Sequence, residues 1–65
     1  MDEKQAEAVA QTLGGVPWNS GGDIWLVLCE RSDGRLTVIS DEAVCEYKNR
    51  EAFDQGQASA TILLH

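Results

Sequence analysis

Histidine, proline and long apolar runs are scarce in this 65-residue sequence. It contains one histidine, His65, and one proline. General acid–base catalysis most often uses a histidine held by a fixed partner, which a terminal residue rarely has, so we expect His65 to be a solvated end. The longest apolar run, Ile24 to Cys29, is too short to cross a bilayer, and we expect no membrane association.

Motifs for metals and nucleotides are also missing. No CxxC or HxxxH pair occurs to start a zinc site, and the acids between Asp41 and Asp54 lack the spacing of a calcium loop. Those acids are typical of a solvated face. The glycine pairs Gly14-Gly15 and Gly21-Gly22 do not form a phosphate-binding motif, and the second pair leads into a strand. We therefore expect no metal and no cofactor.

Two cysteines, Cys29 and Cys45, offer little reactivity. Cys29 lies in the apolar run, where a thiolate is disfavoured, and the carboxylate of Glu46 would raise the pKa of Cys45. We predict that the protein is not an enzyme. The first residues are charged and helical in pattern, which favours a cytoplasmic, reduced setting with free thiols. A disulfide between the two cysteines remains an alternative.

Positive charge is scarce. Five Lys and Arg residues stand against eleven Asp and Glu residues, which gives a net charge of -6. Direct binding to DNA, RNA or anionic lipid is therefore disfavoured. An acidic surface suits a protein partner, and one alternative is an imitation of nucleic-acid phosphate that occupies a DNA-binding protein.

The strongest structural signal is Asp23 to Ser40, which predicts a β-hairpin turning at Ser32-Asp33-Gly34. Two registers are open. A two-residue turn at Asp33-Gly34 places Leu28 opposite Ile39. A three-residue turn closed by a glycine bulge makes two faces. The first has Ile24, Leu26, Leu28, Leu36 and Val38, and the second has Trp25, Val27, Cys29, Thr37 and Ile39. We favour the bulge because it gathers five aliphatic residues on one face.

The N-terminal segment predicts a helix from Glu3 to Leu13. Asp2 and Gln5 have the spacing of a capping box, and Gly14 can end the helix in the left-handed conformation. Small apolar residues recur at helical spacing and make a narrow stripe that can lie close to a sheet. The members of the stripe are Ala6, Val9, Ala10 and Leu13.

The next segment, Val16 to Gly22, has a proline, a tryptophan, small polar residues and glycines, which is typical of a functional loop. We expect Trp18 to fold inward and plug one end of the core. The alternative, which belongs to a small-ligand binder, is that Trp18 and Asn19 line a concave pocket with Asp23. The candidate partner-binding residues are Trp18, Asn19, Ser20, Asp23, Trp25 and Tyr47.

Residues 41–55 allow two interpretations. One is a single helix, whose apolar positions fall out of phase. The other, which we prefer, is a strand from Ala43 to Tyr47 followed by a short helix from Arg50 to Gln55, capped by Asn49 and ended by Gly56. Ser59 to Leu64 then predicts a last strand.

Together these segments predict one α+β domain over residues 1–65. An N-terminal helix packs on a three- or four-stranded antiparallel sheet built on the hairpin, with a short second helix before the last strand. The predicted core is Val9, Ala10, Leu13, Leu26, Leu28, Leu36, Val38, Phe53, Ile62 and Leu64, with Trp25, Val27 and Ile39 on the second face.

For function we expect a protein-interaction or regulatory module that self-associates, for example as a homodimer, because the hairpin is apolar on both faces. A small-ligand binder or enzyme using Val16 to Asp23 is the alternative. The stretches GRLTVISDEAVCEY and REAFDQG resemble parts of a small bacterial protein, and this resemblance includes no motif with known chemistry.

Overall fold

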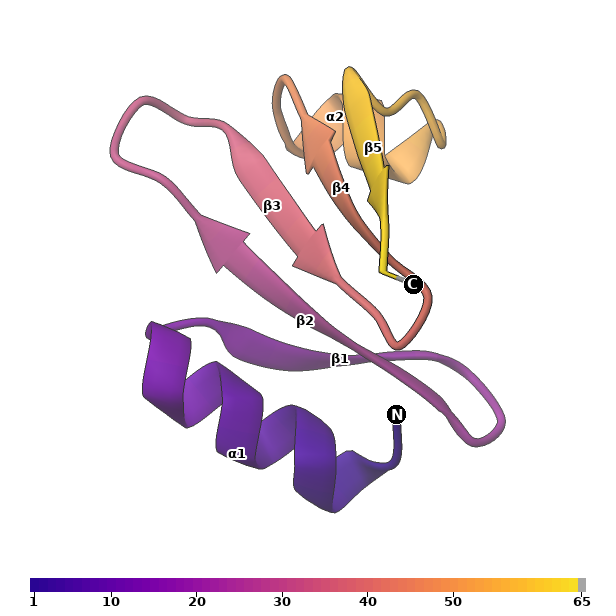
Figure 1. The fold of residues 1–65 in the computed structure, drawn as a ribbon. Coiled ribbons are helices and arrows are strands. Elements are labelled where there is room, and N and C mark those ends of the chain that lie inside the picture. The colour runs from indigo at the N-terminus through magenta and orange to yellow at the C-terminus, as the bar shows by residue number, and fades with distance from the viewer. Residues whose placement is uncertain (65) are drawn as a thin grey trace.

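Two helices and five strands follow one another in the computed structural model, which describes residues 1–64 (Figure 1). The strands form one antiparallel sheet in chain order, β1-β2-β3-β4-β5. This confirms the predicted α+β fold, with one strand more than we expected. His65 lies outside the described residues. The elements are α1 (Glu3–Leu13), β1 (Val16–Gly21), β2 (Ile24–Glu30), β3 (Leu36–Ile39), β4 (Ala43–Tyr47), α2 (Arg50–Asp54) and β5 (Ala60–Leu63).

The additional strand is β1, and the prediction of a loop at Val16 to Gly22 was wrong. Proline and glycine disfavour an inner strand, but β1 lies at the edge of the sheet, where Pro17 needs no amide donor on its open side. The side chain of Asn19 then closes the turn into β2. Its Oδ1 accepts from Gly21 N at 2.9 Å, and its Nδ2 donates to Gly22 O at 3.1 Å. The small polar residues therefore shape a hairpin.

The central hairpin has the bulged register that we favoured. Leu28 pairs with Val38, and Glu30 pairs with Leu36. Gly34 has a φ of 90°, and its N–H donates to Arg31 O at 3.1 Å. The left-handed glycine closes a three-residue turn, so Leu26, Leu28, Leu36 and Val38 share one face of the sheet.

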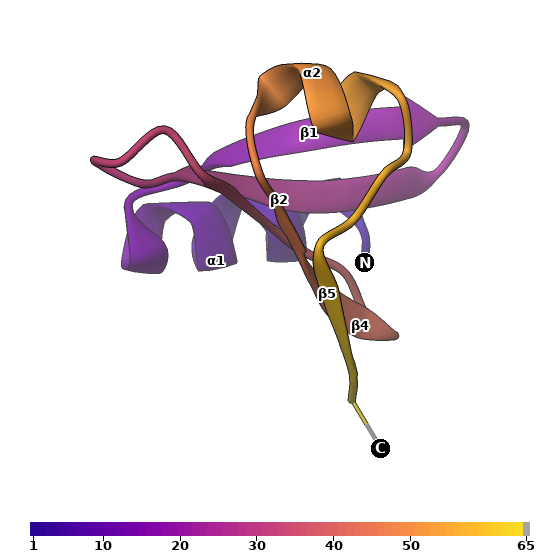
Figure 2. The same ribbon diagram turned by 90° about the horizontal axis from the view of Figure 1, so that it is seen from above.

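Both helices begin where their caps predict. Asp2 and Gln5 form the capping box of α1, and Gly14 ends it with a φ of 72°. Asn49 caps α2 by accepting from Ala52 N at 2.8 Å, which confirms the strand followed by a short helix. Figure 2 shows α1 and α2 on opposite sides of the β1-β2 hairpin.

Each helix covers a different part of the sheet. The predicted core grouped Val9 and Ala10 of α1 with Leu26 and Leu28, and this grouping was wrong. Instead α1 packs on β1 and β2 and buries Ala6 and Ala10 against Val27 on the second face. The small alanines let the helix backbone approach the sheet closely. The face of Leu28, Leu36 and Val38 is covered by Trp18, Tyr47 and Phe53.

The core is smaller than predicted. Ala10, Leu28, Leu36 and Val38 are buried as expected, while Val9, Leu26 and Phe53 are half-buried. Three predicted core residues are instead exposed, at 54% for Leu13, 64% for Ile62 and 46% for Leu64. The physical reason is coverage: α1 spans β1 and β2, α2 contacts β4, and neither helix covers β5.

Candidate functional site

The residues proposed from sequence as one binding surface lie in three places. Trp18 faces the Leu28 side of the sheet, where it meets the second helix. Trp25 lies on the opposite face, against the Ala6-Ala10 core. Asp23, with Trp25 and Asp41, lines a separate cleft, where Asp41 forms an ion pair with the ammonium group of Met1. The expected pocket of Trp18, Asn19 and Asp23 is therefore not formed.

The polar members of that set have local positions. Asn19 uses its side-chain amide to hold the β1-β2 turn, and Ser20 is exposed on β1. Tyr47 lies in β4 with its ring edge-on to Phe53, at a centroid distance of 5.3 Å and an interplanar angle of 84°. Burial raises the pKa of Tyr47, and neighbouring Cys45 adds to the shift. We therefore expect Tyr47 to keep its proton at neutral pH.

Phe53 connects the two aromatic residues that do share a face. It meets Trp18 edge-on as well, at 5.7 Å and 82°. Such perpendicular pairs are favourable because the positive edge of one ring meets the negative face of the other. The contacts hold α2 above β1 and β4, and they set the position of Arg50 in the first turn of α2.

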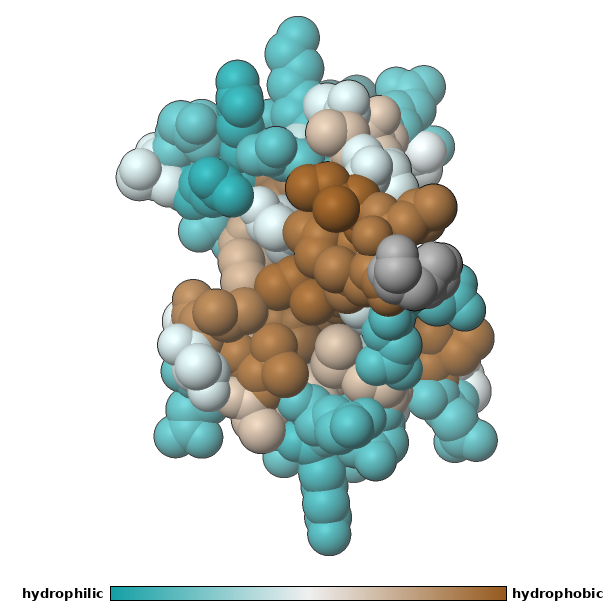
Figure 3. Space-filling model, viewed as in Figure 1, coloured by the Kyte–Doolittle hydropathy of each residue, from teal (hydrophilic) through white to brown (hydrophobic). Residues whose placement is uncertain are grey.

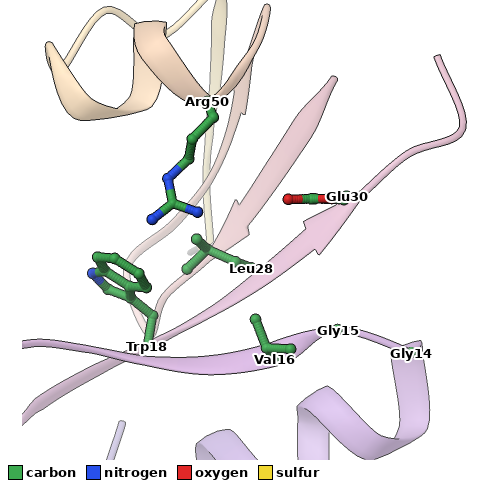
Figure 4. Close-up of a pocket in the computed structure, with 7 residues that line it drawn as sticks. All are labelled: Gly14, Gly15, Val16, Trp18, Leu28, Glu30 and Arg50. Carbon is green, nitrogen blue, oxygen red and sulfur yellow. The ribbon is translucent and has the colours of Figure 1, made fainter. Parts of the chain in front are cut away.

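A cleft of about 330 Å³ opens beside Trp18, between α2 and the β1-β2 hairpin (Figure 4). The guanidinium carbon of Arg50 lies 4.7 Å from the centre of the Trp18 ring and 5.5 Å from that of Phe53. Its Nε lies 3.5 Å from Asp54 Oδ1. The lining residues are Gly14, Gly15, Val16, Trp18, Leu28, Glu30 and Arg50.

Two charged side chains, Arg50 and Glu30, line the cleft together with the apolar side chains of Val16 and Leu28. Figure 4 shows Arg50 extending from α2 toward Trp18 and Leu28, with Glu30 at the end of β2 on the other side. Among residues 1–64 no ion pair or hydrogen bond joins the side chains of Arg50 and Glu30. The cleft thus offers a cation and an anion that are available to a third group.

Sequence reasoning missed both Arg50 and Glu30. A signal for Arg50 existed, because it stands three residues before Phe53 and so shares a helical face with this aromatic residue. Glu30 gave none, since it follows the apolar run as an ordinary strand end. Only the fold brings Glu30 and Arg50, which lie twenty residues apart in the sequence, to one cleft.

The two cysteines are free and lie on opposite faces of the sheet. Cys29 pairs across the strands with Thr37, whereas Cys45 pairs with Val38 one residue further along β3. Because strand neighbours alternate between faces and β3 lies between the two, an internal disulfide does not fit this fold. In the part of the chain that the structure describes, no group of three or more His, Cys, Asp or Glu side chains could hold a metal ion.

Another surface feature is the last strand. β5 is exposed along its whole length, with Ile62 at 64% and Leu63 at 67%. Ile62 pairs with Val44, which in turn pairs with Ile39, so these three apolar residues form a row across β3, β4 and β5. Figure 3 shows hydrophobic atoms gathered on this face above α1, over the region of β5. No helix in residues 1–64 is long and apolar enough to span a membrane.

Comparisons with known proteins add no relative. No family model matches the chain, and neither a curated protein nor a solved structure matches it.

Proposed function

We propose that this protein is an interaction module whose partner is a second copy of itself, joined through β5. The observation that carries the proposal is the exposure of Ile62 and Leu63 on a strand whose outer edge has no neighbour in the described sheet. An open edge presents unpaired backbone groups to another strand, and apolar side chains on both faces would gain contacts from the same pairing.

The two edges of the sheet differ in a way that supports this choice. At one edge, β1 contains Pro17 and a register shift between Asn19 and Gly21, and both features discourage pairing with another strand. At the other edge, β5 has no proline, no charge and no bulge. An edge strand without such protection is expected to pair with another chain, and β5 is therefore the edge that fits a partner.

Charge favours a second copy at the same place. The protein has a net charge of -6, yet residues 55–64 contain no ionisable side chain. Two identical edges can therefore approach each other without bringing their acids together. A strongly basic partner would instead be drawn to the acidic parts of the surface.

The backbone indicates a register for the pair. Leu64 N donates to Glu42 O at 2.9 Å, so the amides of even-numbered residues point toward β4 and those of Thr61 and Leu63 point outward. An antiparallel pair of two β5 strands with two-fold symmetry at Ile62 would form roughly four main-chain hydrogen bonds. In this arrangement Ile62 lies directly opposite Ile62 of the second copy.

Sedimentation equilibrium over micromolar to millimolar concentrations tests the proposal. We expect a weak, reversible dimer, because one strand edge gives a small interface. Ile62→Lys should produce a monomer, since two like charges would then face each other across the pair. Leu13→Lys is the matched control, because Leu13 is a similarly exposed leucine on α1, and this variant should still dimerise.

A mixture of Ile62→Lys and Ile62→Glu tests the register. We expect the two monomeric variants to form a heterodimer, because opposite charges would lie opposite each other. A wild-type protein that stays monomeric throughout would refute self-association. A dimer that survives Ile62→Lys, or variants that fail to restore each other, would refute the β5 interface. As part of the same proposal we place the module in the cytoplasm, where two free thiols stay reduced.

A further inference from the structure

We propose that the cleft beside Trp18 is a binding site for a small zwitterion, an aliphatic α-amino acid being the representative ligand. This inference concerns a different surface from the β5 edge and does not depend on dimerisation. The cleft has a volume of about 330 Å³, which is within the range of small-molecule sites.

Arg50 provides the site for a carboxylate. The guanidinium group of Arg50 is held at the cleft by its contact with the Trp18 ring and by the ion pair of its Nε with Asp54. Asp54 lies beside Nε, and no partner in residues 1–64 occupies the terminal nitrogens. These nitrogens form a planar fork that matches a carboxylate, and a guanidinium stacked on an indole loses little side-chain freedom on binding.

Glu30 provides the site for an ammonium group. Its carboxylate lies at the same cleft, and no hydrogen bond or ion pair to it is found in the described residues. A ligand with only a carboxylate would be attracted by Arg50 and repelled by Glu30. A ligand that carries both charges satisfies the two side chains together, which is the reason for choosing a zwitterion.

The apolar lining beside the two charges selects an aliphatic side chain on the ligand. Val16 is 57% exposed, so a ligand in the cleft can cover it. Leu28, which is only 3% exposed, anchors this apolar lining in the sheet. The Trp18 ring forms the adjoining wall (Figure 4). Covering Val16 and the Trp18 ring would remove apolar surface from water and add to the affinity.

Nuclear magnetic resonance gives a direct test, because the protein has two tryptophans on opposite faces. Leucine added to the ¹⁵N-labelled protein should shift the indole N–H of Trp18 and the amide of Gly15. The indole N–H of Trp25, which packs under α1, should stay in place and serves as an internal control. We expect 4-methylpentanoate, which lacks the ammonium group, and 3-methylbutylamine, which lacks the carboxylate, to bind about tenfold more weakly.

Substitutions separate the two charges. Glu30→Gln at the exposed end of β2 should weaken leucine binding about tenfold and leave 4-methylpentanoate unaffected or improved. Arg50→Lys keeps the charge but loses the fork, and it should also weaken binding of leucine. The matched controls are Glu7→Gln on α1 and Arg35→Gln in the β2-β3 turn, which should bind leucine as the wild type does.

Three outcomes would overturn the inference. The first is the absence of any Trp18 shift at tens of millimolar leucine. The second is equal binding of leucine and 4-methylpentanoate, which would make the site one for simple carboxylates. The third is unchanged leucine binding by Glu30→Gln. None of these results depends on whether the protein dimerises, because the readout is confined to Trp18 and Gly15.

Discussion

Gly15 is predicted to accept no side chain, not even a methyl group, without a large loss in the free energy of unfolding. A methyl group added there would lie 2.6 Å from Leu28 O, 2.7 Å from Cys29 Sγ and 3.2 Å from Val27 Cγ1. The first contact is with the backbone of β2, which cannot move without disturbing the centre of the sheet. Gly15 therefore lets the chain leave α1 and pass directly over β2.

The cost of Gly15→Ala can be estimated from these contacts. Overpacking a well-filled site typically costs about 1–3 kcal/mol, and two contacts under 3.0 Å place this variant toward the upper end. Replacing glycine also restricts the unfolded chain, which offsets about 0.4–1 kcal/mol. We expect a net loss of about 2 kcal/mol. A domain of this size has a total stability of about 3–10 kcal/mol, so the loss is large.

Urea unfolding followed by circular dichroism measures this loss, with Gly14→Ala as the control. Gly14 has open space around its α-carbon and a φ of 72°, so alanine there meets only the left-handed backbone penalty, about 1 kcal/mol. In a Cys29→Ala background the cost of Gly15→Ala should fall, because one of the two short contacts is gone. A Gly15→Ala variant within about 0.5 kcal/mol of the wild type would refute the reasoning.

Tyr47 and the second helix give two further tests. The protein has one tyrosine, so the absorbance of tyrosinate reports on Tyr47 alone, and we expect it to ionise at a higher pH in the folded protein than in urea. Because the folded-state pKa is raised, the contribution of protonated Tyr47 to folding stability is fully present below the ordinary value of 10.0. This contribution is lost as the pH rises through the folded-state pKa. Equal folded and unfolded titrations would contradict this. Asn49→Ala should lower the free energy of unfolding in urea by about 1 kcal/mol, because it removes the cap of α2, and it should weaken any ligand contact at Arg50. An unchanged urea midpoint would show that the cap is dispensable.

The sequence was a good guide wherever one local rule decided the structure. The capping box at Asp2, the bulged turn at Gly34 and the cap at Asn49 each depend on a few adjacent residues, and each is confirmed. Strand β1 was missed because its composition is that of a loop, and only its position at the sheet edge makes Pro17 acceptable. Topology, which local signals do not contain, decided that case.

The faces of the hairpin show the same limit. Sequence showed that both faces are apolar, but not which helix covers which face. α1 lies on the Val27 face because Ala6 and Ala10 allow close approach there, and the aromatic side chains of Trp18, Tyr47 and Phe53 cover the other face. The cleft beside Trp18 depends on the packing of α2 against these aromatic side chains, because only this packing brings Arg50 of α2 to the same cleft as Glu30 of β2. The candidate site therefore depends on tertiary packing.

The two proposed surfaces are also independent for a structural reason. The cleft lies between α2 and the β1-β2 hairpin, whereas the proposed contact is at β5, the opposite edge of the sheet. No residue lining the cleft belongs to β5, and the apolar row of Ile39, Val44 and Ile62 faces away from Trp18. A dimer formed through β5 would leave both clefts open. Leucine should therefore bind Ile62→Lys as well as it binds the wild type, and a dimer dissociation constant that changes with leucine would show that the sheet couples its two edges.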